Sequence, residues 1–303
     1  MKILLFGKNG QVGWELQRSL AVLGEVVALD VHGPAPWRAD FLDPESLAGT
    51  VRALAPGLIV NASAHTAVDK AESEPDRAFR INAVATGVLA REAAAAHAWL
   101  VHYSTDYVFD GSGGEPWTEE SIPAPINVYG RSKLEGEELI RRSGCRHLIF
   151  RTSWVYSSRG QNFARTMLRL AKERDTLSII DDQVGAPTGA ELLADITAHA
   201  WRRAAANPAL AGTYHAVAAG QTSWFGYAKH VIEFARQCGE PVRTLPDALR
   251  PIPSTAYPLP AARPLNSRLS TRKLRDAFDI HLPPWQAGVE RMLSELLARQ
   301  EAA

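Results

Sequence analysis

The chain has 303 residues, 46% apolar and 22% charged, which is enough to bury one large core or two modest ones. Lysine plus arginine and aspartate plus glutamate balance at 33 each, which argues against the positive surface of a nucleic-acid binder. Two cysteines without CxxC spacing suggest neither a disulfide framework nor a zinc site. Because no apolar run approaches the ~18 residues of a membrane span and the first one is too short for a secretion signal, we expect a cytoplasmic protein with no membrane partner.

Short apolar segments rich in β-branched residues alternate with longer segments of helical period, which is typical of βαβ units around a parallel sheet. Right-handed crossovers between such units give the expected fold class, α/β with a doubly wound parallel Rossmann sheet. Strands are predicted at residues 2–6, 25–29, 58–61, 99–103 and 147–151. Helices are predicted at residues 11–23, 44–55, 75–97 and 129–142, the second of them starting at the Asp43-Pro44 pair.

The alternation loosens after about residue 155, and prolines recur without period between Pro241 and Pro264. We therefore expect residues 1–155 to form mainly a dinucleotide-binding Rossmann domain. Residues 156–303 are expected to form mainly a smaller C-terminal substrate-binding region, with some segments returning to the Rossmann core.

The string GKNGQVG places Gly7, Gly10 and Gly13 directly after the first strand and at the start of the first helix. Glycine is needed there because the turn is tight and the backbone must approach a pyrophosphate closely. The free N–H groups of the helix N-terminus then point at the phosphates. A glycine-rich turn that binds no cofactor could have the same sequence, but its position between the first strand and the first helix favours a cofactor site.

Asp30 ends the second strand, where a carboxylate can accept hydrogen bonds from the adenine ribose. That placement favours NADH, although Lys8 or Arg38 could offset the repulsion of a 2′-phosphate, so NADPH stays open. A solvated aspartate at a strand end is the alternative. Further residues at the ends of strands, where the adenine and the nicotinamide ribose would lie, are Asp40, Phe41, Ala62, Ala64, His65 and Thr66.

Tyr129 and Lys133 stand four residues apart in YGRSK and share one face of the predicted helix. A neighbouring ammonium favours the phenolate and prepares the tyrosine for proton transfer. Thr105, at the end of the fourth strand, can hold a substrate oxygen beside the tyrosine. Taken alone, the Tyr-Lys pair could lie on the surface and the Ser-Thr pair could form a simple turn. However, the glycine turn, the Ser-Thr pair and the Tyr-Lys pair occur in the order that a reductase requires.

Eight strings extend this pattern along nearly the whole chain: LLFGKNGQVG, VNASAHTAVDKAESEP, HYSTDYVFDG, NVYGRSKLEGE, FRTSWVY, DDQVGAPTGAELLAD, AYPLPAARPLNSRL and LPPWQAGVERML. Together they resemble the dTDP-4-dehydrorhamnose reductases, a family of extended short-chain dehydrogenases/reductases. The resemblance implies reduction of a dTDP-linked 4-keto sugar by NAD(P)H, in the last step of dTDP-L-rhamnose synthesis.

The resemblance also implies roles for individual residues. The catalytic residues would be Thr105, Tyr129 and Lys133, and the substrate residues would be Thr105, Asp106 and Trp154. The cofactor residues would be Gly7, Gly10, Gln11, Val12, Asp30, Asp40, Phe41, Ala62, Ala64, His65, Thr66, Tyr129 and Lys133. From their chemistry alone, Arg263 and Arg268 are candidates for the diphosphate, with ordinary surface arginines as the alternative.

A homodimer is a further implication, with Mg²⁺ between subunits in some members; the matching acids here would be Glu15 and Glu191. Nothing in their spacing demands a metal. Two other functions stay open. A nucleotide-sugar epimerase or dehydratase would use the same tyrosine, but a dehydratase would place a second carboxylate where this chain has Tyr107. A non-catalytic dinucleotide-binding subunit typically loses the tyrosine or the lysine, and this chain keeps both.

Overall fold

A computed structural model gives the fold and describes residues 1–33, 37 and 39–301; Arg38 lies outside the described residues. Six parallel strands form the central sheet, in the order β10-β5-β4-β3-β1-β2. Their bounds are β1 Lys2–Phe6, β2 Glu25–Leu29, β3 Leu58–Asn61, β4 Trp99–Thr105, β5 Arg146–Thr152 and β10 Gly212–His215. The doubly wound parallel sheet is thus confirmed, and the strand order reverses direction between β1 and β3.

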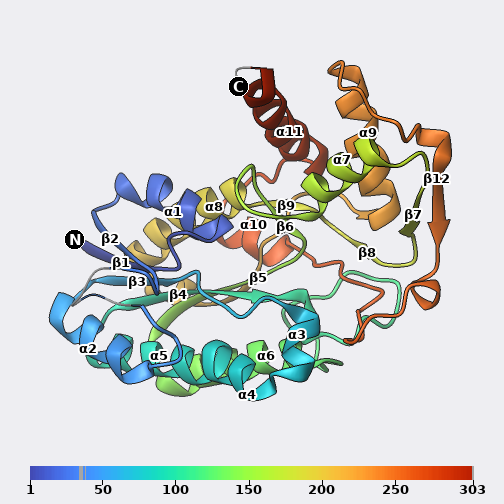
Figure 1. Cartoon of the computed structure of the whole chain (residues 1–303). Coiled ribbons are helices and arrows are strands. Elements are labelled where there is room, and N and C mark those ends of the chain that lie inside the picture. Colours follow the sequence, from blue (N-terminus) through green and yellow to red (C-terminus); the bar gives the residue numbers. More distant parts are fainter. Residues whose placement is uncertain (34–36, 38, 302–303) are drawn as a thin grey trace.

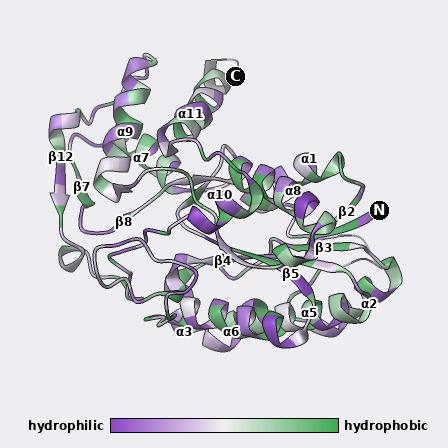
Figure 2. Cartoon of the chain, turned by 180° about the vertical axis from the view of Figure 1, so that it is seen from behind, coloured by the Kyte–Doolittle hydropathy of each residue, from purple (hydrophilic) through white to green (hydrophobic). Residues whose placement is uncertain are grey.

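Both faces of this sheet are covered, so its strands are apolar on both sides. Along β1, Ile3 and Leu5 belong to the core on the α1 and α8 side, whereas Leu4 and Phe6 belong to the opposite core. Successive side chains of a strand point to opposite faces, which explains the division. Figure 2 shows the resulting hydrophobic colouring of the sheet between helices whose outer faces are more hydrophilic.

Figure 1 shows the two helical layers: α1 and α8 lie above the sheet, and α2, α5 and α6 lie below it. Their bounds are α1 Gln11–Ala21, α8 Ala190–Ala206, α2 Pro44–Leu54, α5 Thr86–Ala95 and α6 Val128–Ser143. Asp43 caps α2 as expected, since its side chain accepts a hydrogen bond from the backbone N–H of Ser46. The predicted helix over residues 75–97 is three pieces instead: α4 Pro75–Phe79, a π-helix Arg80–Ala85 and α5.

Residues after 155 are more regular than the sequence pattern suggests. β10 extends the Rossmann sheet beside β5, and α8 packs against α1. A second core, built mainly on Tyr156, Tyr227 and Trp285, joins helices that stand apart from the sheet in Figure 1. These helices are α7 Phe163–Glu173, α9 Trp224–Gln237 and α11 Trp285–Glu301. Three pairs of short strands accompany them. In these pairs, β6 Val155–Tyr156 lies beside β9 Thr188–Gly189, β7 Leu177–Ile180 beside β12 Leu249–Ile252, and β8 Val184–Gly185 beside β11 Thr222–Ser223.

Two further short α-helices are α3 Val68–Ser73 and α10 Arg272–Phe278. Within the described residues, no helix is both long and apolar enough to cross a membrane.

One buried ion pair ties α6 to the sheet. Arg151 on β5 donates two hydrogen bonds to the Glu137 carboxylate, from Nε at 2.9 Å and from Nη2 at 2.7 Å. Both side chains are almost fully buried. Ser104 on β4 and Arg141 on α6 also donate to this carboxylate, at 2.5 and 2.6 Å. The pKa of the Glu137 carboxyl is lowered even though burial opposes it, because these donors stabilise the charge.

Removing one member of this pair is expected to destabilise the fold strongly. Arg151→Met leaves the Glu137 charge buried with fewer donors, which costs about 3–5 kcal/mol of unfolding free energy. Denaturant unfolding of parent and variant measures the loss. The exposed Arg169–Glu173 pair provides the control, because Arg169→Gln should cost less than about 1 kcal/mol. Equal losses in both variants would contradict a special role for the buried pair.

Candidate active site

The candidate site lies at the carboxyl ends of the parallel strands, beside the reversal between β1 and β3. Ligands of open α/β sheets bind in the crevice that this reversal creates. β1 ends at Phe6, β3 at Asn61 and β4 at Thr105, so the glycine turn, the Ala62–Thr66 segment and Thr105 come to one edge.

The glycine turn closes tightly on its surroundings. Gly7 has φ +87°, and a Cβ placed on it would lie 2.8 Å from the carbonyl group of Ala62. A Cβ on Gly13 would lie 2.0 Å from the carbonyl oxygen of Gly7. Among the described residues no side chain caps the start of α1 at Gly10, so the N–H groups of the first turn stay available to an anion. These features fit the pyrophosphate of a dinucleotide.

The next two residues of α1 are partly buried. Gln11 accepts hydrogen bonds from Ser157 and Asn162, each at 3.3 Å, and so joins the glycine turn to the loop after β6. Val12 packs on the sheet core.

The end of β2 is also polar. The Asp30 carboxylate accepts hydrogen bonds from the Asn9 side-chain amide and from the backbone N–H of His32, the latter at 3.0 Å. Asp40 accepts from the backbone N–H of Leu42 at 2.9 Å. Phe41 is buried and packs edge-on against Phe6 with ring centroids 5.8 Å apart.

The segment after β3 is braced from the π-helix. Asn82 accepts from the His65 backbone N–H at 2.8 Å, and its Nδ2 donates both to the His65 carbonyl and to Ser132 Oγ on α6. Ala64 is partly buried and Thr66 is exposed. Nδ1 of His65 is buried without a hydrogen-bond partner among the described residues, which leaves a polar group for a bound ligand.

Thr105 and Tyr129 meet directly. Thr105 is the last residue of β4, because the strand runs two residues further than the predicted 99–103. The neighbouring Thr105 hydroxyl lowers the pKa of Tyr129, but burial outweighs this effect and raises the pKa to about 12. The Tyr107 ring packs edge-on against the Tyr129 ring, with centroids 5.6 Å apart. Tyr129 therefore holds its proton at neutral pH.

Lys133 lies one turn further along α6 and is fully buried. Its Nζ donates to the backbone oxygen of Tyr103 at 2.6 Å and lies 3.1 Å from Nε2 of His102. The lysine and the tyrosine thus share a helix face but have different hydrogen-bond partners. In this arrangement burial, and not the ammonium group, dominates the pKa of Tyr129.

Asp106 follows Thr105 and is 2% exposed. One carboxylate oxygen accepts from Thr105 Oγ1 at 3.0 Å, and Ser267 is a further side-chain partner, whereas Oδ2 has none among the described residues. Burial raises the pKa of Asp106 to about 6.

Trp154 lies between β5 and β6 in a strained backbone conformation, with φ +49°. Its indole stacks on Trp224 with ring centroids 3.6 Å apart, and Trp224 Nε1 donates to Gln183 at 3.1 Å. A Cβ on Gly185 would meet the Trp154 ring at 2.8 Å, so the indole is held on two sides.

The two candidate diphosphate arginines both have protein partners. Arg263 donates to Asp69 at 2.7 Å and to the backbone oxygen of Ala261. Arg268 Nε donates to Asn266 at 2.9 Å.

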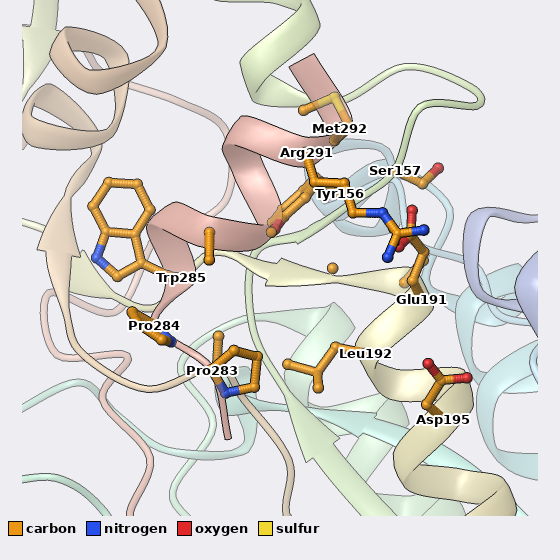
Figure 3. A pocket seen from close by; sticks show the side chains of 15 residues that line it. Tyr156, Ser157, Glu191, Leu192, Asp195, Pro283, Pro284, Trp285, Arg291 and Met292 are labelled. Atoms are coloured by element: carbon orange, nitrogen blue, oxygen red, sulfur yellow. The ribbon is translucent and has the colours of Figure 1, made fainter. Parts of the chain in front are cut away.

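The two candidate metal ligands lie near one another, but each faces an arginine. Arg18 lies 3.6 Å from Glu15, and Arg291 on α11 lies 3.5 Å from Glu191. Figure 3 shows Arg291 extending toward Glu191 in a pocket of 260 Å³. Among the described residues, no three potential ligands come together. In the described part of a single chain, both acids are therefore paired with arginines.

Comparison with known proteins assigns the family. Residues 1–298 match the family model described as the RmlD substrate binding domain. The chain belongs to this family. It is 57% identical over 296 residues to the dTDP-4-dehydrorhamnose reductase of Escherichia coli K12, covering 98% of both proteins.

Solved structures of RmlD-type proteins agree. A dTDP-4-dehydrorhamnose reductase from Clostridium acetobutylicum superposes with TM-score 0.88 at 33% identity, over 98% of this chain and 100% of the other. The Bacillus anthracis enzyme in complex with NADP gives TM-score 0.84 at 32% identity, over 97% and 99%. The resemblance inferred from the sequence strings is confirmed.

Several polar residues around this RmlD-type site carry no sequence signal of their own. Asn82 lies in a π-helix, which the hydrophobic periodicity does not distinguish from an α-helix. Single turns of π-helix are frequent at functional sites. His102 lies inside a buried strand, where a lone histidine is indistinguishable from a core residue. Asn127 is the exception, because an asparagine just before a predicted helix indicates an N-cap. It does cap α6, since its side chain accepts a hydrogen bond from the backbone N–H of Gly130 at 2.7 Å.

The raised pKa of Asp106 predicts a specific dependence of stability on pH. Between the usual carboxyl value near 3.8 and about 6, the folded protein keeps a proton that the unfolded chain has lost. The contribution of Asp106 to stability therefore falls by about 3 kcal/mol as the pH rises through this window.

Denaturant unfolding at a series of pH values between 4 and 7 measures this contribution as the difference between parent and Asp106→Asn, which cannot titrate. Parallel stability curves for the two proteins would contradict the raised pKa.

Proposed function

We propose that this chain reduces dTDP-4-dehydro-β-L-rhamnose to dTDP-β-L-rhamnose with NADPH or NADH, the last step of dTDP-L-rhamnose biosynthesis and a source of cell-surface polysaccharide precursor. The observation that carries the proposal is the Thr105–Tyr129 contact at the crevice, with Tyr129 protonated and Lys133 one turn away. The names of the relatives at 57% and 33% identity support the substrate.

In this reaction a bound nicotinamide supplies the hydride. Tyr129 donates its phenolic proton to the oxygen on C4 of the sugar as negative charge develops there. Thr105 holds the tyrosine hydroxyl and the substrate oxygen together, which fixes the direction of transfer. Lys133 holds the nicotinamide ribose and stabilises the phenolate that remains.

The cofactor would occupy the crevice from the glycine turn to α6. Gly7, Gly10, Gln11 and Val12 would hold the pyrophosphate, and Asp30, Asp40 and Phe41 the adenosine end. The turn formed by Ala62, Ala64, His65 and Thr66 would meet the nicotinamide ribose with Tyr129 and Lys133. The NADP complex of the Bacillus anthracis relative supports a nicotinamide cofactor here. The bonds that Asp30 makes to Asn9 and to the backbone of His32 would hold its carboxylate in place for the ribose.

The substrate would lie between this Rossmann domain, mainly residues 1–155, and the region built mainly from residues 156–303. Asp106, in the first of these parts, has Ser267 of the second as a side-chain partner, and both Ser267 and the Trp154 ring lie close to Gly185. Trp154 offers a fixed aromatic surface, and Asp106 a hydrogen-bonding group, to the dTDP-sugar.

The assignment favours reduction over the two alternatives. A dehydratase needs a second acid beside Thr105 and Asp106, and the Tyr107 ring occupies that position against Tyr129. A non-catalytic dinucleotide-binding subunit would not need Tyr129 and Lys133 together.

The reaction would take place in the cytoplasm, in a homodimer. A magnesium ion bound through Glu15 and Glu191 would need ligands from a second chain and a rearrangement of Arg18 and Arg291, because one chain presents these acids to arginines.

Tyr129→Phe is the direct test of the proton donor. It removes the hydroxyl and little packing, so kcat should fall by about 10²–10⁴-fold while NADPH affinity changes little. Oxidation of NADPH followed at saturating keto sugar, together with a cofactor titration, measures both quantities. Tyr107→Phe is the matched control and should retain most activity. A Tyr129→Phe enzyme within twofold of the parent would remove Tyr129 from the mechanism.

Asp30 is expected to set the cofactor preference. Asp30→Ala loses charge-assisted hydrogen bonds to the ribose and should weaken NADH binding by about tenfold, while NADPH weakens less or improves because a repulsive charge is gone. Dissociation constants of both cofactors, measured by titration of parent and variant, decide the matter. Equal weakening of the two would show that the ribose is recognised elsewhere.

A further inference from the structure

A line of buried polar groups lies behind Lys133. Asn61 ends β3, His102 is in β4 and Lys133 is in α6, and each is at most 1% exposed. Asn61 Nδ2 lies 3.2 Å from His102 Nδ1, and His102 Nε2 lies 3.1 Å from Lys133 Nζ. Both ring nitrogens of the histidine are therefore engaged, one on each side.

The backbone N–H of Ser63 determines which atom of the Asn61 side-chain amide faces His102. Oδ1 of Asn61 lies 3.0 Å from the backbone N–H of Ser63, which can only donate. The oxygen must face that donor, so Nδ2 faces His102 and the Thr86 hydroxyl. Since Nδ2 can only donate, Nδ1 of His102 must accept. A neutral imidazole with a bare Nδ1 carries its proton on Nε2.

Nε2–H then points at Lys133 Nζ. An ammonium group has no lone pair and could not accept this hydrogen bond, whereas a neutral amine can accept it and still donate to Tyr103 O. We propose that His102 is a positioning residue that donates through Nε2–H to Lys133 and stabilises the neutral amine of that lysine.

The surrounding charges are compatible with this arrangement. Burial lowers the pKa of Lys133 to about 8, and Glu137, on the same helix, opposes the shift. Glu137 is itself neutralised by Arg151 from β5 and by Arg141. Burial and the proximity of Lys133 hold the pKa of His102 well below its usual value, so the ring is neutral. The remaining titratable group on this face of α6, Tyr129, is bonded to Thr105.

The consequence is a lysine whose charge changes close to physiological pH. Protonating Lys133 forces the His102 proton to Nδ1, where it would meet Asn61 Nδ2, so the ammonium form costs a buried hydrogen bond. If Lys133 supports Tyr129 as an ammonium, which rests on the proposed function, His102 sets the alkaline limit of the reaction.

The first test needs no substrate. NMR of protein labelled with ¹⁵N-histidine is expected to show His102 as a neutral ring, protonated at Nε2 and bare at Nδ1, at pH 9, where Lys133 with its pKa of about 8 is mostly the neutral amine. The ring resonances are assigned by through-bond correlation to the backbone of His102, which needs no variant. At pH 9, a His102 ring protonated at Nδ1, or at both nitrogens, would overturn the proposal, even if every variant at this position failed to fold.

The second test follows Lys133 itself. Lysine ¹³Cε resonances, with Lys133 assigned by Lys133→Met, report its titration in parent and His102→Gln. Glutamine can turn its carbonyl oxygen to Lys133 and favour the ammonium, so the pKa of Lys133 should rise by about one pH unit. His199→Gln, whose ring lies in α8 against Phe278 O, is the control and should leave it unchanged.

Enzyme kinetics complete the set. The alkaline limb of kcat/KM should move to higher pH in His102→Gln by the same amount and stay in place in His199→Gln. A folded His102→Gln protein with an unchanged Lys133 titration would overturn the inference. A shifted titration with an unmoved activity profile would retain it and count instead against the role proposed for Lys133 in catalysis.

Discussion

The site depends on how helix α6 is held against β4 and β5. Tyr129, Lys133 and Glu137 follow one another at intervals of four along α6 and face the sheet. Glu137, bound to Arg151 and Ser104, fixes the third of these positions and so the rotation of the helix. A Cβ on Gly136 would lie 2.3 Å from the Asn82 carbonyl oxygen, which shows how closely α6 approaches the π-helix. The buried ion pair and the close backbone contact thus fix the position of Tyr129, the proton donor, on α6.

The same burial prepares the chemistry. Groups in the crevice lose solvent, so their neutral forms are favoured: Tyr129 keeps its proton, the pKa of Asp106 rises and the pKa of Lys133 falls. His65 Nδ1 and Asp106 Oδ2 are buried without partners among the described residues. Because an unpaired buried polar group costs free energy, these atoms are the ones that a bound ligand would satisfy.

Much of the fold could be predicted because its signals are local. Strands β1, β2 and β3 have the predicted bounds, and Asp43 caps α2 as its sequence context indicates. The pieces after residue 155 could not be placed, since the pairing of β10 with β5 depends on contacts distant in sequence. In the site, the motifs predicted that Thr105 and Tyr129 would meet. They could not predict that Lys133 would bond to His102 and Tyr103, because both partners lie inside a strand whose residues are all buried and carry no separate sequence signal.

The central claim is that hydride passes to C4 of the sugar while Tyr129 supplies the proton to its oxygen. The most direct measurement follows isotope transfer from NADPH carrying deuterium at either face of nicotinamide C4 to the dTDP-4-keto sugar, with the product analysed by mass spectrometry and NMR. The account predicts that one of the two labelled cofactors delivers one deuterium to C4 and that the same reaction with unlabelled NADPH in D₂O places none on that carbon. Deuterium entering C4 from D₂O in place of the cofactor, or formation of product without oxidation of NADPH, would contradict it.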